Sequence, residues 1–173
     1  MIIIIEGIDR VGKTTLANII SKHFGIPIFK QERLGGNNSN GDNSSEEYTI
    51  LNYGRALGLV DFWNSDSFKD DVIVDRFHWT EAVYSKIDRH NIKSSKYMSN
   101  VEYIMSKARN KYFIIQVMPI DINYCIRQHG SDLKEHQKEF NMWYETSDLI
   151  KYRCSYYSYD LAIEEIERRL HYV

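Results

Sequence analysis

Short apolar runs and longer amphipathic segments alternate along the chain. The apolar runs lack helical spacing and cover residues 2–5, 26–29, 72–74, 112–118 and 153–157. Such runs are typical of buried β-strands, and the segments between them show helical spacing. Because alternating strands and helices require crossover connections, we predict an α/β three-layer sandwich with a parallel five-stranded sheet. The length of 173 residues fits a single domain over residues 1–173.

Two segments carry the clearest helical pattern. Residues 14–24 place the side chains of Leu16, Ile19, Ile20 and Phe24 on one face. Residues 161–170 do the same with Ile163, Ile166 and Leu170. Because an apolar stripe on a helix has to be buried, we expect both faces to pack on the sheet.

One long segment breaks the alternation. Residues 35–47, "GGNNSNGDNSSEE", contain no large apolar side chain and are rich in Gly, Asn and Ser, which predicts a loop. Long loops in compact domains are often functional. The segment therefore has two interpretations: a surface excursion without a role, or a mobile loop that orders over a ligand.

Composition limits the kinds of molecule that this protein is expected to bind. The formal net charge of -2, from 22 Lys+Arg and 24 Asp+Glu, gives no basic field for a polymeric nucleic acid, whereas a small anionic ligand fits. Cys125 and Cys154 lie far apart, which indicates buried thiols in a reducing cytoplasm. The apolar run at 2–5 is too short for a signal segment or a membrane span. We expect a cytoplasmic protein without a membrane partner.

The strongest motif follows the first apolar run. Residues 7–14, "GIDRVGKT", fit G-x-x-x-x-G-K-[ST], with a predicted strand before them and a predicted helix after them. Gly7 and Gly12 allow backbone angles that side chains would block, so successive N–H groups can cradle a β-phosphate at a helix N-terminus. The motif therefore predicts a phosphate-binding loop.

The side chains at the end of this loop indicate the ligand. Lys13 supplies a charge for the β- and γ-phosphates, the Thr14 hydroxyl is a ligand for Mg²⁺, and Thr15 can donate to the α-phosphate. We predict ATP–Mg²⁺ or another nucleoside triphosphate. Kinases, GTPase switches and motor ATPases all use such loops, but "NKYF" at 110–113 lacks the aspartate that guanine recognition requires.

A second acidic position follows the third apolar run. "VIVDRF", residues 72–77, ends its strand at Asp75 and Arg76. At the carboxyl edge of a parallel sheet, an aspartate beside the phosphate loop can hold Mg²⁺ and an arginine can face a phosphate. Asp75 is therefore a second candidate for the metal site.

Four segments together resemble the thymidylate kinases and their relatives among the P-loop deoxynucleotide and deoxynucleoside kinases. They are "EGIDRVGKTT" at 6–15, "KQERLGG" at 30–36, "ILNYGRALG" at 50–58 and "VDRFHWTEAVY" at 74–84. The resemblance covers the first half of the chain well and the second half in outline. One departure is Leu51, which stands where thymidylate-binding members commonly place an aromatic ring that stacks on the base.

The resemblance implies roles for residues outside the phosphate loop motif. Asp9 would lie beside the acceptor nucleotide, and Tyr84 near its sugar or base. The arginines expected around the acceptor monophosphate are Arg33, Arg55 and Arg76. Arg10 would be the catalytic arginine that bridges donor and acceptor, because some thymidylate kinases carry that arginine in the loop directly after the aspartate.

A closing lid is also implied, at about residues 127–139. Its cations are Arg127, which would contact the ATP, and Lys134 and Lys138. Phosphoryl transfer needs charge near the transferring group and exclusion of water, and a lid can provide both. A solvent-facing pair of charged helices is the alternative interpretation of this segment.

These observations predict a nucleotide kinase that transfers the γ-phosphoryl group of ATP to a (deoxy)nucleoside monophosphate, with dTMP or a related pyrimidine deoxynucleotide as the acceptor. One alternative is a deoxynucleoside kinase, in which Glu32 or Asp9 would act as the base. Another is a non-catalytic nucleotide-binding regulator. The base, the sugar and the oligomeric state, a homodimer included, stay open.

Overall fold

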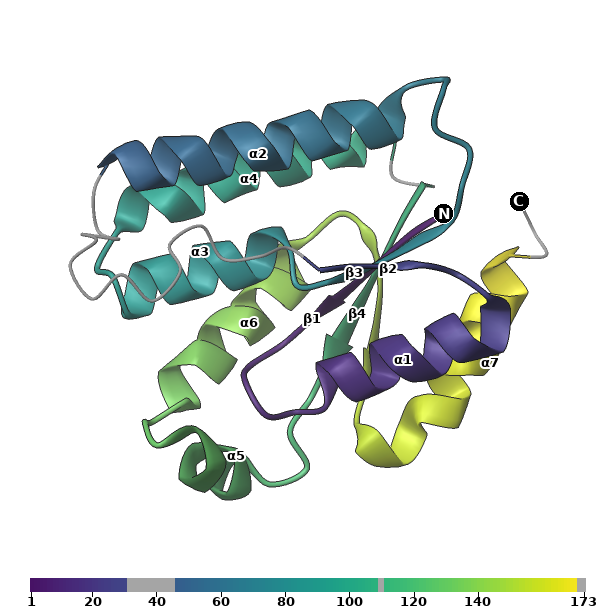
Figure 1. The fold of residues 1–173 in the computed structure, drawn as a ribbon. Helices are drawn as coiled ribbons and strands as arrows, with labels where there is room; N and C mark the ends of the chain where they lie inside the picture. The colour runs from purple at the N-terminus through teal and green to yellow at the C-terminus, as the bar shows by residue number, and fades with distance from the viewer. Residues whose placement is uncertain (31–45, 109–110, 171–173) are drawn as a thin grey trace.

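The computed structural model describes residues 1–30, 46–108 and 111–170. Within them, five strands form one parallel sheet in the order β2-β3-β1-β4-β5. The strands are β1 (Ile2–Glu6), β2 (Ile28–Lys30), β3 (Val72–Asp75), β4 (Tyr112–Val117) and β5 (Ile150–Cys154). Helices cover both faces of the sheet (Figure 1), so the predicted fold class is confirmed.

Strand β1 lies at the centre of the sheet. Ile2 pairs with Val72 on one side and with Tyr112 on the other, and all five residues of the strand are buried. A strand with neighbours on both sides and helices on both faces meets no water, which explains its uninterrupted apolar run. The carboxyl ends of β1, β3 and β4 consequently meet at one edge of the sheet.

The helices divide between the two faces. They are α1 (Lys13–Phe24), α2 (Glu46–Asn64), α3 (His78–Ile87), α4 (Ile92–Ser106), α5 (Ile122–His129), α6 (Lys134–Thr146) and α7 (Tyr159–Leu170). Figure 1 shows α1 and α7 on one face, and α2, α3, α4 and α6 on the other. Helix α5 lies beyond the carboxyl edge of the sheet, next to the loop that joins β1 to α1.

Two strands and one helix face differ clearly from the sequence prediction, whereas the other three strands agree with it to within one residue. The last strand was predicted at 153–157 but runs over Ile150–Cys154, because Tyr156–Ser158 form a short 3₁₀ turn closed by the Ser155 and Ser158 side chains. The second strand covers Ile28–Lys30 rather than 26–29. In α1, Leu16 and Ile20 are buried as predicted, whereas Ile19 is 39% exposed.

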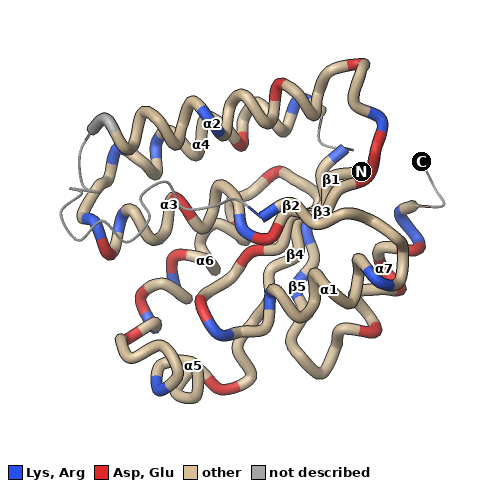
Figure 2. Tube along the Cα trace, in the orientation of Figure 1, with Lys and Arg blue, Asp and Glu red and all other residues tan. Residues whose placement is uncertain are grey.

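The other expectations have mixed outcomes. Most of the predicted loop at 35–47 lies outside the described residues, and its last two residues begin α2. Both cysteines are buried free thiols, as predicted. Acidic and basic positions are interspersed along the chain (Figure 2). No described helix is long and apolar enough to cross a membrane.

Candidate active site

Two glycines fix the backbone of the loop between β1 and α1. Gly7 has φ 140°, and a Cβ atom there would lie 2.5 Å from the Val117 carbonyl oxygen at the end of β4. Gly12 has φ 94°, and a Cβ atom there would collide with the Tyr159 hydroxyl. That hydroxyl donates a hydrogen bond to the Gly12 carbonyl at 2.9 Å. The loop is thus held between β4 and α7, with room for glycine only.

Lys13 is buried inside this loop. Its side chain is 3% exposed, and Nζ donates to the Ile8 carbonyl at 2.5 Å. Burial, together with the nearby charge of Arg76, lowers the pKa of Lys13 to about 7, although nearby carboxylates such as Asp9 oppose the shift. An anionic ligand stabilises an ammonium group that is shielded from water. Binding the β- and γ-phosphates is the role predicted for Lys13.

Thr14 and Asp75 form the candidate metal site. The Thr14 hydroxyl donates to Asp75 Oδ2 at 2.7 Å. The other carboxylate oxygen, Oδ1, is buried and has no hydrogen-bond partner among the described residues. A hydroxyl and a carboxylate with an unpartnered oxygen fit the hard oxygen ligands that Mg²⁺ prefers. The predicted pairing of these two residues in space is therefore realised.

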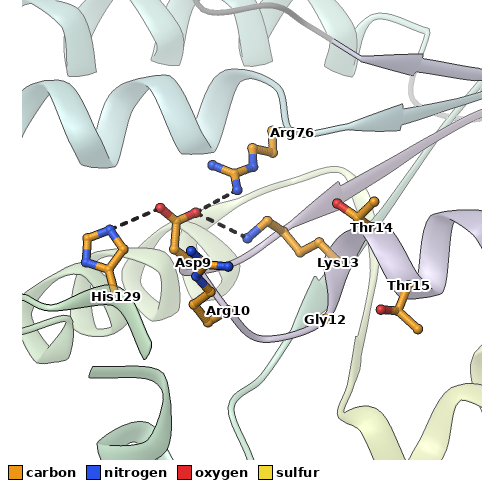
Figure 3. Close-up of a pocket in the computed structure, with 8 residues that line it drawn as sticks. All are labelled: Asp9, Arg10, Gly12, Lys13, Thr14, Thr15, Arg76 and His129. Atoms are coloured by element: carbon orange, nitrogen blue, oxygen red, sulfur yellow. Dashed lines mark ion pairs between the residues drawn. The ribbon is translucent and has the colours of Figure 1, made fainter. Parts of the chain in front are cut away.

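Asp9 is the point where the charges of the site meet (Figure 3). Its Oδ1 lies 2.7 Å from Arg76 Nη2 and 4.0 Å from Lys13 Nζ, and its Oδ2 lies 3.3 Å from His129 Nε2. Its backbone N–H donates to the Tyr84 hydroxyl at 2.9 Å. Residues from α1, the end of β3, α3 and α5 thus meet at Asp9 in the loop.

A polar cavity of about 650 Å³ opens at this point. Its lining residues are Asp9, Arg10, Gly12, Lys13, Thr14, Thr15, Arg76 and His129. Seven of these were predicted from the sequence as site residues, and His129 was not. Arg10 is exposed and has φ 68°, and Arg76 has φ 76°. Left-handed backbone at two non-glycine residues is costly and is concentrated at functional sites.

Glu6 caps the first turn of α3, which begins two residues after Arg76. It is fully buried, and its carboxylate accepts hydrogen bonds from the backbone N–H groups of Phe77, Trp79 and Thr80 at 3.0, 3.0 and 3.2 Å. The Thr80 hydroxyl donates to it as well. Phe77 is the N-cap of α3 and has no acceptor of its own, so Glu6 caps this helix from another strand. Burial raises the pKa of Glu6, although His78 and the hydrogen bonds oppose the rise.

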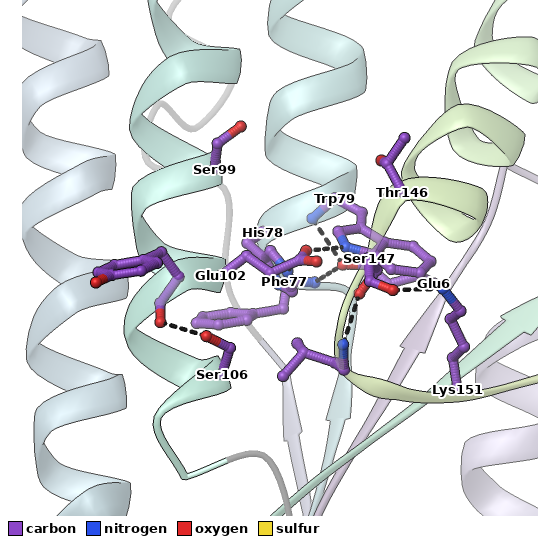
Figure 4. A network of polar contacts seen from close by, with 12 residues as sticks. Glu6, Phe77, His78, Trp79, Ser99, Glu102, Ser106, Thr146, Ser147 and Lys151 are labelled. Atoms are coloured by element: carbon purple, nitrogen blue, oxygen red, sulfur yellow. Dashed lines mark hydrogen bonds and ion pairs between the residues drawn. The ribbon is translucent and has the colours of Figure 1, made fainter.

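A second buried network lies behind this turn (Figure 4). His78 Nε2 lies 2.8 Å from Glu102 Oε2, and Trp79 Nε1 donates to the same oxygen at 2.7 Å. Burial would raise the pKa of Glu102, but the hydrogen bonds from its partners outweigh burial and lower it. These bonds join the first turn of α3 to α4, and so they fix the segment that begins with Arg76.

Several predicted residues lie elsewhere. Arg33 falls outside the described residues. Arg55 is half-buried in α2 and is not among the residues that line the cavity. The Arg127 side chain is 65% exposed and lies 3.8 Å from Asp121 Oδ2, and Lys134 and Lys138 are exposed on α6. Their roles in binding ATP or acceptor stay predictions.

Two residues were missed by the sequence reasoning. Glu6 stands in the quoted motif, and a charged residue at the end of a fully buried strand could have indicated a buried cap. His129 lies within the predicted lid, directly before Gly130. No local pattern marks it, because its contact with Asp9 depends on how α5 docks.

Comparison with known proteins relates the fold to solved structures. No protein-family model matches the sequence, and no curated protein matches it. The YorR protein of Bacillus subtilis, solved with phosphorylated GDP, superposes with a TM-score of 0.67 at 21% identity, covering 99% of this chain and 96% of that chain.

Two named kinases superpose over nearly their whole length. Deoxyadenosine kinase of M. mycoides, with bound dATP, gives a TM-score of 0.59 at 17% identity and covers 99% of this chain and 100% of that chain. Thymidylate kinase of Ehrlichia chaffeensis gives 0.59 at 18% identity, covering 97% and 98%. The chain therefore has the P-loop kinase fold found in thymidylate and deoxyadenosine kinases.

Proposed function

We propose that this chain is a nucleotide kinase that transfers the γ-phosphoryl group of ATP to a (deoxy)nucleoside monophosphate, with dTMP or a related pyrimidine deoxynucleotide as the acceptor. The observation that carries the proposal is the ion pair between Asp9 and Arg76, 2.7 Å long, in the same cavity as Lys13 and Thr14. Donor-binding and acceptor-binding groups thereby face one space.

The phosphate loop provides the donor side. Its backbone N–H groups and Lys13 hold the β- and γ-phosphates, and Thr15 holds the α-phosphate. Thr14 and Asp75 are the residues that would hold Mg²⁺, which neutralises phosphate charge when bound. Because Lys13 is buried, its charge interacts more strongly with a bound phosphate than it would in water.

The acceptor side is formed by arginines. Arg76 faces the acceptor phosphate, and Arg10 lies between the two phosphate groups. An oxygen of the acceptor monophosphate forms the new bond to the γ-phosphorus while the bond from that phosphorus to the bridging β,γ-oxygen breaks, and ADP leaves. Because the acceptor oxygen is already anionic, the reaction needs positioning and charge neutralisation rather than a base.

A deoxynucleoside kinase is the second candidate, since one superposed structure is a deoxyadenosine kinase. Its acceptor hydroxyl requires a carboxylate base within hydrogen-bond reach. Asp9 has contacts at both oxygens, with Arg76 at 2.7 Å and His129 at 3.3 Å. A role as base would compete with these two contacts of Asp9, which favours a phosphate acceptor. The other candidate base, Glu32, lies outside the described residues.

A panel of nucleosides and their monophosphates, each incubated with γ-labelled ATP, tests the proposal. We expect label in nucleoside diphosphates and none in products of the nucleosides. Label transfer to nucleosides but to no monophosphate would favour the second candidate. Binding of ATP without transfer to any acceptor would favour a regulator.

A further inference from the structure

His129 makes a contact at each nitrogen of its ring. It is the last residue of α5, which ends at Gly130 in a left-handed conformation. Nε2 lies 3.3 Å from Asp9 Oδ2, and Nδ1 lies 2.6 Å from the Ser131 hydroxyl. Figure 3 shows the imidazole turned toward Asp9 across the cavity. Two partners on one ring fix its orientation.

A second contact from the same helix reaches the phosphate loop. Cys125, one turn earlier in α5, is buried, and its thiol lies 3.7 Å from the Arg10 carbonyl oxygen. The cations expected in the lid lie elsewhere: Arg127 pairs with Asp121, and Lys134 and Lys138 are exposed. Among the described residues of α5 and α6, His129 is the side chain that lines the cavity.

Two other cations lie on the opposite side of the Asp9 carboxylate from His129. Arg76, at the end of β3, and Lys13, in α1, both lie on the side of Oδ1, at 2.7 and 4.0 Å. Tyr84 of α3 accepts from the Asp9 backbone N–H, and Arg10 of the loop lines the same cavity. His129 lies on the side of Oδ2, at 3.3 Å. Contacts on both oxygens limit rotation of the carboxylate more than contacts on one oxygen do.

We propose that His129 is a positioning residue that orients Asp9 and docks α5 onto the phosphate loop. This inference rests on the proposed function in one respect, namely that Asp9 meets the acceptor. The Ser131 hydroxyl at Nδ1 helps to hold the ring so that Nε2 faces the Asp9 carboxylate.

Three variants test separately the N–H donor of His129, the charge of its ring and its partner carboxylate. His129→Ala removes the contact, His129→Gln keeps an N–H donor without a charge, and Asp9→Asn removes the partner carboxylate. The matched control is His23→Ala, because His23 lies 2.9 Å from Glu167 in an exposed pair between α1 and α7, away from the cavity.

We expect His129→Ala to lower kcat/KM for the acceptor about tenfold, and His129→Gln about threefold. In the Asp9→Asn background, His129→Ala should cost less than about twofold more, because residues that act as a unit are not additive. An undiminished effect in the Asp9→Asn background would overturn the proposal.

Hydrogen exchange provides a readout that does not depend on activity. The amides of Ile122–His129 should exchange several times faster in both His129→Ala and Asp9→Asn, and at the wild-type rate in His23→Ala. Unchanged exchange in both site variants would overturn the proposal even in an active kinase. Faster exchange in a protein that phosphorylates no nucleotide would support the docking contact while refuting the proposed function.

Discussion

The proposed donor side and the proposed acceptor side of the cavity are built in different ways. The donor side is a short continuous segment whose backbone is fixed by glycines, with Gly7 against Val117 and Gly12 against Tyr159. The acceptor side is assembled from side chains of separate elements, Arg76 after β3 and His129 at the end of α5, which meet at Asp9. A site of the first kind depends on backbone geometry, and one of the second kind depends on how distant elements dock.

The largest expected effect comes from removing the buried cation Lys13, in comparison with the exposed Lys138. Lys13→Ala removes the ammonium group that is 3% exposed in the loop, and we expect the transfer rate to fall about a thousandfold. Lys138→Ala is the control, because Lys138 is exposed on α6, and its rate should stay within about twofold of wild type. Steady-state kinetics with saturating acceptor measures both. If the Lys13→Ala enzyme kept a large part of the wild-type rate, the proposed role of Lys13 in binding the donor would be wrong.

A glycine substitution tests the backbone of the donor side. Gly7→Ala places a Cβ atom 2.5 Å from the Val117 carbonyl oxygen at φ 140°, so the loop has to shift. We expect ATP affinity, measured by calorimetry, to fall about a hundredfold, with a lower Tm. In α2, a Cβ atom at Gly58 meets nothing within 4 Å, so Gly58→Ala should bind ATP normally and raise the Tm slightly. Equal ATP affinity in the two variants would contradict a donor site fixed by its backbone.

The buried cap tests whether the acceptor side depends on docking. Glu6→Gln keeps the shape of the side chain but points an amide N–H₂ at the N–H groups of α3, and we expect unfolding to become easier by about 2 kcal/mol. Because Arg76 lies next to this turn, kcat/KM for the acceptor should fall about tenfold, and ATP affinity much less. Chemical denaturation and kinetics measure the two effects. Glu167→Gln is the control, since Glu167 is exposed. A fall in ATP affinity without a fall in kcat/KM for the acceptor would contradict the assignment of Glu6 to the acceptor side.

The smallest expected effect is a pH dependence of ATP binding. The pKa of Lys13 is lowered to about 7 by burial, and a bound phosphate raises it. Above pH 7 binding therefore takes up a proton, so affinity weakens as pH rises, by at most about tenfold per pH unit. Below pH 7 Lys13 is already charged and contributes no further change. Calorimetry in buffers of different ionisation enthalpy measures the proton uptake, and proton release above pH 7 would contradict the lowered pKa.

The same difference between the two sides explains what the sequence could predict. The donor loop is encoded in consecutive residues, so Gly7, Gly12, Lys13, Thr14 and Thr15 could be named directly. Asp75 and Arg76 follow a buried strand, and parallel topology brings that strand end to the loop. The short apolar runs indicate the sheet, and helical periodicity indicates α1 and α7. The last strand was misplaced because aromatic residues Tyr156 and Tyr157, which suit strands, lie in a 3₁₀ turn.

Contacts that depend on docking were not predictable in the same way. His129 meets Asp9 only because α5 packs beyond the carboxyl edge of the sheet, and Glu6 meets α3 across 71 residues of chain. The sequence around His129 carries no local pattern for its contact, and the buried position of Glu6 in β1 could indicate a cap but not which helix it caps. Arg127, two residues before His129, looked equally suitable in the sequence but pairs with Asp121 on the surface.

Transfer of label from γ-labelled ATP to dTMP tests the central claim most directly, with thymidine in a parallel reaction and Asp9→Asn beside the wild type. We predict labelled dTDP from dTMP, no labelled product from thymidine, and a rate lowered about a hundredfold in Asp9→Asn. Labelled dTMP from thymidine, with no dTDP from dTMP, would contradict the account, because it would place a hydroxyl acceptor in the cavity and require a base there.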